Sequence, residues 1–381
     1  MTLILAFCVL TSAGLVFFVS THYQELTQLL RVVTLVRSQA LEPTDADRLL
    51  LGAARGIVEA LEDPYSSYLN PEQYRSLSQQ ISGSYGGVGL VIGVDQEGRI
   101  KVITPFKGTP AHRAGIQSGD LIVRIDGRDA LNLSLEEAAR LLQGQPGTPV
   151  TLAVQRPGDG LREFRVVREK IVIPSVEATL LPGHSNFGYV NITTFNSQTP
   201  SALAAGLEEI KVERLQGLVL DLRNNPGGEL TAALEVAEYF VPAGPVVYTV
   251  SRRETTPYYA SGRKLNLPVV VLVNRGTASA AEIVAGAVQD TGSGTLVGER
   301  TFGKGRVQKV FPLHGGAALK LTTEKYLTPS RRDIDGKGIE PDVVVPMSAE
   351  ETAQALLEAP DLRRDRQLQK AVEILQASLA K

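Results

Sequence analysis

The chain has 381 residues, which is long for one domain, and its 43% hydrophobic and 21% charged residues are typical of a globular protein. Its net charge is −2, and no run of Lys and Arg is long enough to form a basic stripe, which argues against a nucleic-acid partner. We therefore expect two or three folded domains that act on something other than nucleic acid.

The first 21 residues contain no Asp, Glu, Lys or Arg. About 20 apolar residues are enough to span a bilayer as a helix. A cleaved signal peptide is the alternative, but Phe18 and Val19 make a poor cleavage site and a basic start is missing. We expect residues 1–21 to be an uncleaved anchor with an extracytoplasmic remainder (periplasm or cell envelope); cleavage would give a secreted protein. The missing basic start also leaves open a true start further upstream.

The single cysteine, Cys8, lies in this apolar stretch, so no disulfide can form within the chain. We expect it to be a small apolar residue of the membrane helix.

Residues 22–83 are expected to form a helical region. Apolar residues recur at helical spacing from Leu26, Pro43 interrupts the pattern, and Thr44-Asp-Ala-Asp47 predicts the start of a second helix. A turn-rich linker follows at residues 63–71. The pattern is compatible with packing either on the rest of the chain or on another subunit.

Residues 84–168 show the strand, helix and turn order of a small β-rich domain. Short strands are predicted around Leu90 to Val94, Ile100 to Ile103 and Val150 to Val154, and Ser134-Leu-Glu-Glu137 predicts a capped helix. This order resembles a PDZ domain. The resemblance implies that Gly87-Val-Gly-Leu90 binds a free C-terminal carboxylate through backbone N–H groups. The expected peptide site comprises Gly87, Val88, Gly89, Leu90, Ile92 and Leu141, with Ala138 as a further wall residue.

Residues 169–346 alternate between strands and helices, which predicts an α/β core. Two strand–turn–helix units stand out. In the first, residues 217–222 form a buried strand, 223–228 a turn and 229–240 a helix. In the second, Val269 to Val273 precede a break at 274–277 and a helix that starts near Ser279.

Ser279 is therefore expected at the first turn of a helix, where free backbone N–H groups favour a nucleophilic serine. An ordinary helix cap is the alternative. Lys304 lies between two glycines, and a Ser–Lys pair is a known variant of the serine-nucleophile arrangement. The lysine must be neutral to accept the serine proton, and burial favours that form. Gln308 could orient its amine if residues 306–311 form a strand.

Several motifs in the same order resemble the carboxyl-terminal processing peptidases, also called tail-specific proteases. They are Leu220-Asp-Leu-Arg-Asn-Asn-Pro-Gly-Gly228, Thr277-Ala-Ser-Ala-Ala-Glu282, Thr301-Phe-Gly-Lys-Gly305, Gln308 and Lys337-Gly-Ile-Glu-Pro-Asp342. The resemblance implies a crotonase- or Clp-protease-like core carrying an inserted PDZ domain. It implies a serine endopeptidase that uses Ser279, Lys304 and Gln308, with an oxyanion hole from the backbone N–H groups of Gly228 and Ala280.

The resemblance also implies that Arg168, at the PDZ exit, couples that domain to the active site. A solvated surface charge is its alternative. It further favours a role in dimerisation for the N-terminal helices. The pattern of residues 347–381 predicts a charged helical tail that packs either on the core or between subunits.

Expected partners are protein substrates with a free, apolar C-terminus, a second copy of the chain and a regulatory protein. No metal or other cofactor is implied, because the chain has neither clustered His and Cys nor a phosphate-binding loop. The main alternative function is a membrane-anchored PDZ adaptor with an inert core, and acyl-group chemistry on a crotonase-like core is a third. A histidine base is the alternative to Lys304, with His314, which closely follows the Gln308 strand, as the candidate.

Overall fold

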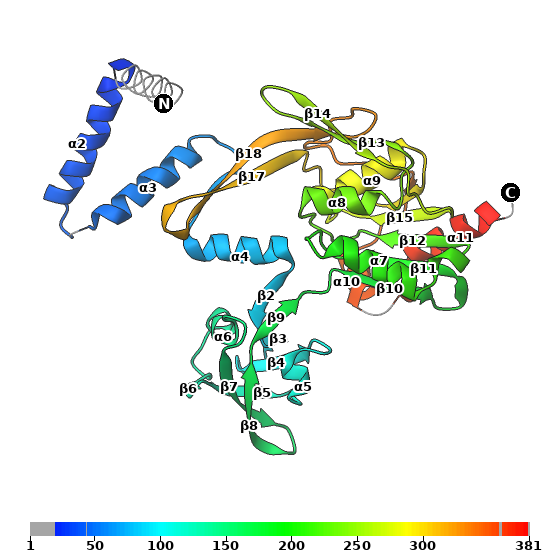
Figure 1. Ribbon diagram of the computed structural model, residues 1–381, viewed down its shortest axis with the longest axis horizontal. Helices are drawn as coiled ribbons and strands as arrows, with labels where there is room; N and C mark the ends of the chain where they lie inside the picture. Colours follow the sequence, from blue (N-terminus) through cyan, green and yellow to red (C-terminus); the bar gives the residue numbers. More distant parts are fainter. Residues whose placement is uncertain (1–19, 43, 358–359, 380–381) are drawn as a thin grey trace, which may run out of the picture. The chain divides into compact units, whose positions relative to one another are not determined.

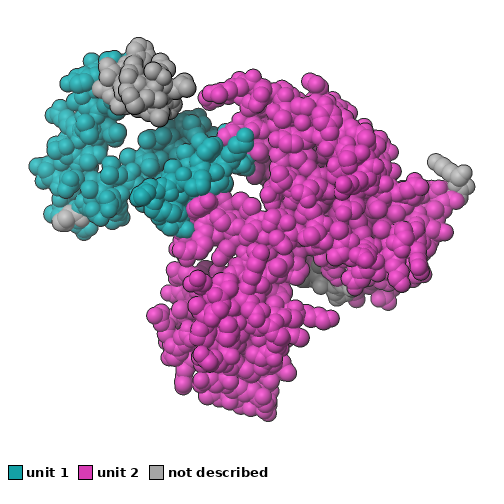
Figure 2. Space-filling view, in the orientation of Figure 1, with its two compact units in different colours: residues 1–71, 308–322 teal, residues 72–307, 323–381 magenta. Residues whose placement is uncertain are grey.

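The structure is a computed structural model that describes residues 20–42, 44–357 and 360–379. The predicted membrane segment at residues 1–21, with Cys8, lies almost wholly outside these residues. Within the described part of the chain, no helix combines the length and apolar character needed to cross a membrane. Figure 2 colours the two compact units of the chain, residues 1–71 with 308–322 and residues 72–307 with 323–381.

The first unit contains two of the predicted helices, α2 (Tyr23–Gln39) and α3 (Ala46–Glu59). The side chain of Asp45 caps α3 by accepting a hydrogen bond from Asp47 N at 3.4 Å, which confirms the predicted helix start. The predicted linker contains a short strand that the sequence pattern did not indicate, β1 (Ser67–Leu69). This strand pairs with the first residues of β18 (Ala318–Leu327).

The described residues of the PDZ-like segment form one antiparallel sheet in the order β3-β4-β5-β7-β8, with β6 beside β5. Ser134 and Glu137 make the predicted capping box at the start of α6, with hydrogen bonds of 3.2 and 2.8 Å. The bounds are β3 (Leu90–Val94), β4 (Ile100–Pro105), α5 (Pro110–Arg113), β5 (Leu121–Ile125), β6 (Arg128–Asp129), α6 (Leu135–Leu142), β7 (Pro149–Arg156) and β8 (Gly160–Val167).

The chain enters and leaves this domain through one antiparallel pair. Helix α4 (Pro71–Ser82) leads into β2 (Ser84–Gly87), and β2 pairs with β9 (Glu169–Val172) after the domain. The predicted domain boundaries at residues 84 and 168 stay a prediction.

The predicted α/β core is confirmed, because it contains a six-stranded sheet in the order β10-β11-β12-β15-β16-β19. All pairs are parallel except β10 with β11. The strands are β10 (Val176–Leu181), β11 (His184–Ile192), β12 (Gly217–Asp221), β15 (Val269–Val273), β16 (Thr295–Gly298) and β19 (Val343–Val344).

Both faces of this sheet are covered, which explains the unbroken apolar runs of its central strands. In β15, Val269, Val271 and Val273 pack into a cluster with helices α7 (Thr199–Glu209), α8 (Leu230–Ala237) and α9 (Ala280–Asp290). Val270 and Leu272 face the other way, against helix α11 (Arg366–Leu379) (Figure 1).

The C-terminal tail is helical as predicted, in α10 (Ala349–Leu357) and α11. Leu368, Ala371 and Leu375 of α11 are buried against the sheet, so the tail is part of the core. The remaining elements are the strands β13 (Gly244–Val250), β14 (Thr255–Ala260) and β17 (Arg306–Pro312) and the short helices η1 (Val212–Arg214) and η2 (His314–Gly316).

Candidate active site

Two turns meet at the carboxyl ends of the neighbouring parallel strands β12 and β15, the edge at which α/β sheets place their sites. The amides of Asn224 and Asn274 join the turns, because Asn274 Oδ1 accepts from Asn224 N and Asn274 Nδ2 donates to Asn224 Oδ1, both at 2.9 Å. Thr277 Oγ1 donates to Leu222 O at 2.8 Å. The two predicted strand–turn–helix units therefore form one hydrogen-bonded structure.

Gly227 and Gly228 lie where only glycine fits. Both have positive φ, 93° and 140°. A Cβ on Gly228 would lie 1.9 Å from Phe195 O, and one on Gly227 would lie 2.8 Å from both Ala280 N and Ser279 Cβ. The Gly-Gly turn therefore stands directly against the start of α9.

Ser279 is the residue that precedes α9, as predicted, and it adopts a strained backbone conformation with φ 54° and ψ −118°. Ser279 and Glu282 occupy the two positions of a capping box, in which Ser279 N donates to Glu282 Oε2 at 2.8 Å. The Ser279 carbonyl accepts from Glu282 N at 2.8 Å and from Ile283 N at 3.1 Å. The strained backbone of Ser279 is the feature that departs from an ordinary helix cap.

Glu282 joins the serine to the lysine loop. Its side chain is fully buried and accepts hydrogen bonds from two parts of the chain. Oε2 accepts from Ser279 N at 2.8 Å and Lys304 N at 2.9 Å, and Oε1 accepts from Thr301 Oγ1 at 2.5 Å and Gly303 N at 2.7 Å. One buried carboxylate thus fixes the backbone of Ser279 relative to that of Lys304.

The loop around Lys304 is held by several further bonds. Phe302 N donates to Thr277 O at 2.9 Å and Tyr326 N to Gly305 O at 2.9 Å. Gly305 N donates to Asp335 Oδ1 at 3.1 Å. Lys304 itself is partly buried.

Tyr326 supports the serine from β18. Its hydroxyl donates to Ser279 O at 3.0 Å. Burial and the nearby carboxylates of Glu282 and Asp335 raise the pKa of Tyr326 well above its usual range. The tyrosine therefore stays protonated at neutral pH, as the hydrogen bond to Ser279 O requires.

Gln308, the third predicted catalytic residue, belongs to the first unit, where its Nε2 donates to Thr322 Oγ1 at 3.3 Å. The proposed role of Gln308 stays a prediction. Among the histidines, His112 Nδ1 accepts from Gly108 N, His184 stacks on Phe187, and His314 is in η2 of the first unit. The histidine base stays an untested alternative.

The PDZ-like domain has a pocket between β3 and α6. Four residues of the predicted site line it, Val88, Gly89, Leu90 and Ile92. The helix contributes Ala139 and Leu142 instead of the predicted Ala138 and Leu141, and Gly87 is not in the lining, whose other members are Tyr85 and Gln143. Ala138 is fully buried in the domain core and Leu141 is packed against that core.

Arg168 is not the solvated surface charge of the alternative interpretation, because it is only 8% exposed. Its Nη2 donates to Leu141 O at 2.7 Å and its Nε to Leu142 O at 3.2 Å, at the carboxyl end of α6. Nη1 donates to Pro149 O at 2.8 Å and Thr148 Oγ1 at 3.1 Å. The guanidinium therefore connects the helix that lines the pocket to the strand that follows it.

Sequence reasoning missed the positions of Glu282 and Tyr326 in this site. The spacing Ser279-x-x-Glu282 is a capping-box signal and could have pointed to the first. No local pattern marks the second.

Comparisons with known proteins show what the chain is similar to. Residues 186–345 match the model of Peptidase family S41, residues 102–156 match that of the PDZ domain, and residues 17–73 match that of the Activating protease CtpB N-terminal domain. The first two matches lie within the predicted core and PDZ segments.

Individual relatives extend the similarity over most of the chain. The carboxyl-terminal-processing protease of Picosynechococcus sp. is 44% identical over 291 residues, 75% of this chain and 70% of the relative. Carboxy-terminal processing protease CtpA of Bacillus subtilis is 35% identical over 327 residues, 85% of this chain and 70% of the relative. Among solved structures, a photosystem II D1 C-terminal processing protease is 36% identical with a TM-score of 0.50, covering 86% of this chain and 88% of that one.

Proposed function

The chain belongs to the carboxyl-terminal-processing proteases of peptidase family S41, and from this premise we propose that it cleaves extracytoplasmic proteins by acyl transfer at Ser279 after capturing their free C-termini. The membership confirms the family resemblance, the serine peptidase fold and the PDZ domain expected from the sequence. An inert adaptor and acyl-group chemistry on a crotonase-like core are accordingly disfavoured.

In the proposed reaction, Ser279 Oγ attacks the scissile carbonyl carbon and neutral Lys304 accepts the hydroxyl proton. The backbone N–H groups of Gly228 and Ala280 stabilise the oxyanion of the tetrahedral intermediate. Collapse breaks the peptide C–N bond, and Lys304 returns the proton to the leaving amine. Water then hydrolyses the ester on Ser279.

The observation that carries this proposal is the Glu282 carboxylate, which binds the backbone N–H groups of both Ser279 and Lys304. It supports the pairing because preorganisation of nucleophile and base within a fraction of an ångström is what such a reaction requires. The Gly227–Gly228 turn, packed against Ser279 and Ala280, supports the oxyanion site. In the described residues, neither Gly228 N nor Ala280 N donates one of the backbone hydrogen bonds that lie outside the regular helices and strands.

A cleavage assay with the full chain tests the proposal. The substrates are an unfolded protein with an apolar C-terminus and the same protein with a C-terminal amide. We expect the parent chain to cleave the first, to cleave the amide more slowly, and to lose activity on Ser279→Ala. Cleavage that is lost in the variant but indifferent to the amide would keep the peptidase and remove the capture of C-termini. Absence of cleavage with retained tail binding would favour the adaptor.

The lysine is tested separately. Lys304→Arg keeps a positive charge but cannot accept a proton at neutral pH, so we expect turnover to fall by two or more orders of magnitude. Near-normal turnover in the arginine variant would refute the base assignment, and His314→Ala then becomes the decisive variant.

Substrate capture is proposed for the pocket lined by Leu90, Ile92 and Leu142. A peptide would add as a strand beside β3, with its carboxylate on the N–H groups of the loop at Gly87–Leu90. We propose that Arg168 couples peptide binding in this pocket to the active site, because it donates hydrogen bonds to the carbonyls of Leu141 and Leu142 at the end of α6. Arg168→Ala should retain peptide affinity and lose stimulation of cleavage by a tail peptide. Unchanged stimulation would restrict Arg168 to a structural role.

We further propose that residues 1–21 anchor the chain in a membrane and that the first unit mediates homodimerisation. Helices α2 and α3 support the second part, since Leu30 is 68% and Ile57 69% exposed. Sedimentation of the full chain in detergent, with Leu30→Glu as the disrupting variant, tests the dimer. A monomeric parent would refute it. A regulatory protein partner remains a prediction.

A further inference from the structure

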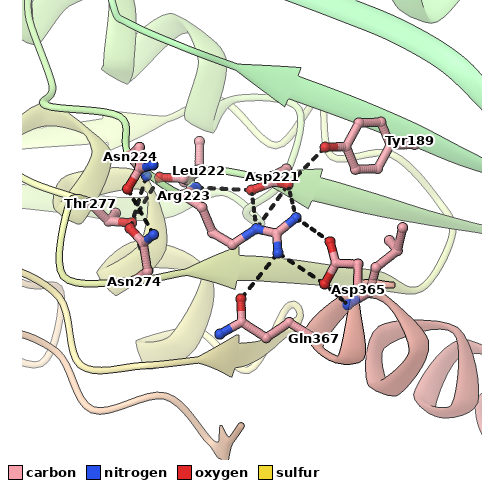
Figure 3. A network of polar contacts seen from close by, with 10 residues as sticks. Tyr189, Asp221, Leu222, Arg223, Asn224, Asn274, Thr277, Asp365 and Gln367 are labelled. Atoms are coloured by element: carbon pink, nitrogen blue, oxygen red, sulfur yellow. Dashed lines mark hydrogen bonds and ion pairs between the residues drawn. The ribbon is translucent and has the colours of Figure 1, made fainter. Parts of the chain in front are cut away.

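The side chain of Arg223, directly before the Asn224–Gly228 turn, is buried between two carboxylates. It lies in a network of polar contacts between four separate parts of the chain: Tyr189, residues 221–224, residues 274–277, and Asp365 with Gln367 (Figure 3). Arg223 Nη2 bonds Asp221 Oδ2 at 2.5 Å and Asp365 Oδ2 at 2.7 Å, and all three side chains are at most 2% exposed. Tyr189 OH also donates to Asp221, at 2.8 Å.

Two of these partners come from the C-terminal tail. Asp365 Oδ1 accepts from Arg223 Nη1 at 3.1 Å, which makes the pair bidentate, and Gln367 Oε1 accepts from the same nitrogen at 3.1 Å. Arg223 Nε donates to Asp221. Every N–H of the guanidinium thus has an acceptor, and the tail provides three of the bonds.

The tail residues are themselves held in place. Asp365 Oδ1 also accepts from Leu368 N at 2.9 Å, in the first turn of α11. Gln367 Nε2 donates to Val345 O at 2.8 Å. Beyond them, α11 is buried against the sheet. Asp365 and Gln367 are therefore fixed acceptors on a docked helix.

The other end of Arg223 leads into the turn. Asp221 Oδ1 accepts from Arg223 N at 2.9 Å, so the same carboxylate binds both the side chain and the backbone. The next residue, Asn224, has φ 54° and is bonded to Asn274. Asn225 Oδ1 then accepts from Gly227 N at 2.8 Å. Displacement of Arg223 would therefore reach Gly228 through a chain of short, directed bonds.

We propose that Asp365 and Gln367 are positioning residues for catalysis: from the C-terminal tail they hold Arg223, and through it the turn that presents the Gly228 amide. Both lie beyond residues 186–345, the segment that matches the peptidase family model. The proposal rests on the proposed function, because it assigns these residues an effect on the reaction at Ser279.

The test compares variants of the full chain with the cleavage substrate above. Asp365→Asn keeps an N-cap for α11 and one acceptor oxygen but loses the bidentate ion pair. We expect kcat to fall on the order of ten- to a hundredfold with KM changed less than about threefold. The rate at which a fluorophosphonate labels Ser279 should fall in parallel, since its phosphoryl oxygen needs the same N–H groups. Binding of a tail peptide should not change.

Two controls separate positioning from general stability. Leu375→Ala removes buried contacts of α11 without touching Arg223, and Glu373→Gln removes an exposed carboxylate of the same helix. Assayed well below their melting temperatures, both should keep kcat within about twofold of the parent. A loss in Leu375→Ala equal to that in Asp365→Asn would overturn the proposal.

Gln367→Met provides a second, milder variant if Asp365→Asn does not fold. It removes the Nη1 acceptor, leaves both carboxylates, and should lower kcat about two- to fivefold. Unchanged kcat in both folded variants, or in Gln367→Met alone if the other fails to fold, would refute the proposal. Ser279-dependent cleavage by the parent must be seen first, because its absence would refute the proposed function, whereas cleavage that ignores Asp365 would refute only this inference.

Discussion

Two turns lie at the carboxyl ends of β12 and β15, and a buried charged side chain holds each of them. Each turn contains a residue with φ 54°, Asn224 in the first and Ser279 in the second. The first depends on Arg223, whose partners are the carboxylates of Asp221 and Asp365. The second depends on Glu282, whose partners are three backbone N–H groups and the Thr301 hydroxyl.

The two turns differ in which groups stabilise the buried charge. Burial alone would lower the pKa of Arg223, but the carboxylates of Asp221 and Asp365 more than reverse this and hold the pKa above its ordinary value. The Glu282 carboxylate accepts hydrogen bonds from uncharged donors in the two loops that it joins. Its hydrogen bonds therefore form only when both loops adopt their native geometry. The first turn therefore depends on a distant segment, whereas the second is stabilised from within.

The largest effect is expected when the bonds of the Glu282 carboxylate to the serine and lysine loops, here called the Glu282 clamp, are broken. Glu282→Gln replaces one carboxylate oxygen, an acceptor, by an amide NH2 group, a donor, which then faces the donors that the oxygen accepted from. Leaving two buried donors unsatisfied should cost about 3 to 5 kcal/mol of unfolding free energy. Displacement of Ser279 and Lys304 should lower kcat at least a hundredfold. Chemical denaturation and cleavage rates check both numbers.

The matched control is Glu340→Gln, which makes the same chemical change in an exposed pair with Arg300. Its effect on stability should stay within about 0.5 kcal/mol. If Glu282→Gln behaved like this control, the clamp would not be what orders the serine and lysine loops.

A methyl group at Gly228 should have the next largest effect. Gly228→Ala brings a Cβ to 1.9 Å from Phe195 O, so the turn must move. We expect kcat to fall on the order of a hundredfold, comparable with the loss of one oxyanion donor. The control is Gly183→Ala. Gly183 also has a positive φ, 77°, but a Cβ added there would have no atom within 4 Å, so this variant should lose stability without a lower kcat. Equal kcat for the two variants would remove Gly228 from the reaction.

Local patterns predicted most elements of the fold. The valine run gave β15 as a strand buried on both faces, and Ser134 with Glu137 marked the start of α6. The edge strand β10 was missed because only Leu181 of its residues is buried, so its apolar residues do not stand out as a core strand. Helix α6 carries adjacent apolar residues on more than one face, which explains why the pocket lining was placed one residue early.

The candidate site was accessible from sequence only in part. Ser279 and Lys304 stand in distinctive motifs, and Glu282 has the spacing of a capping box. The pair of Arg223 with Asp365 joins residues 142 positions apart, and neither has a local pattern that reveals the other. A buried ion pair of this kind is a property of the packed tail, so only the three-dimensional arrangement could show it.

The smallest effect is expected at Thr277, whose hydroxyl forms a hydrogen-bonded link between the two turns. Thr277→Val removes a hydroxyl that donates to Leu222 O and accepts from Asn274 N, while keeping the shape of the side chain. Since Leu222 O and Asn274 N lose a buried partner, we expect a loss of about 1 to 3 kcal/mol in stability. Because Arg223 and Glu282 each keep all their partners, kcat should fall less than about fivefold. A fall as large as that of Glu282→Gln would mean that the turns are held chiefly by each other, and that the two buried charges only follow.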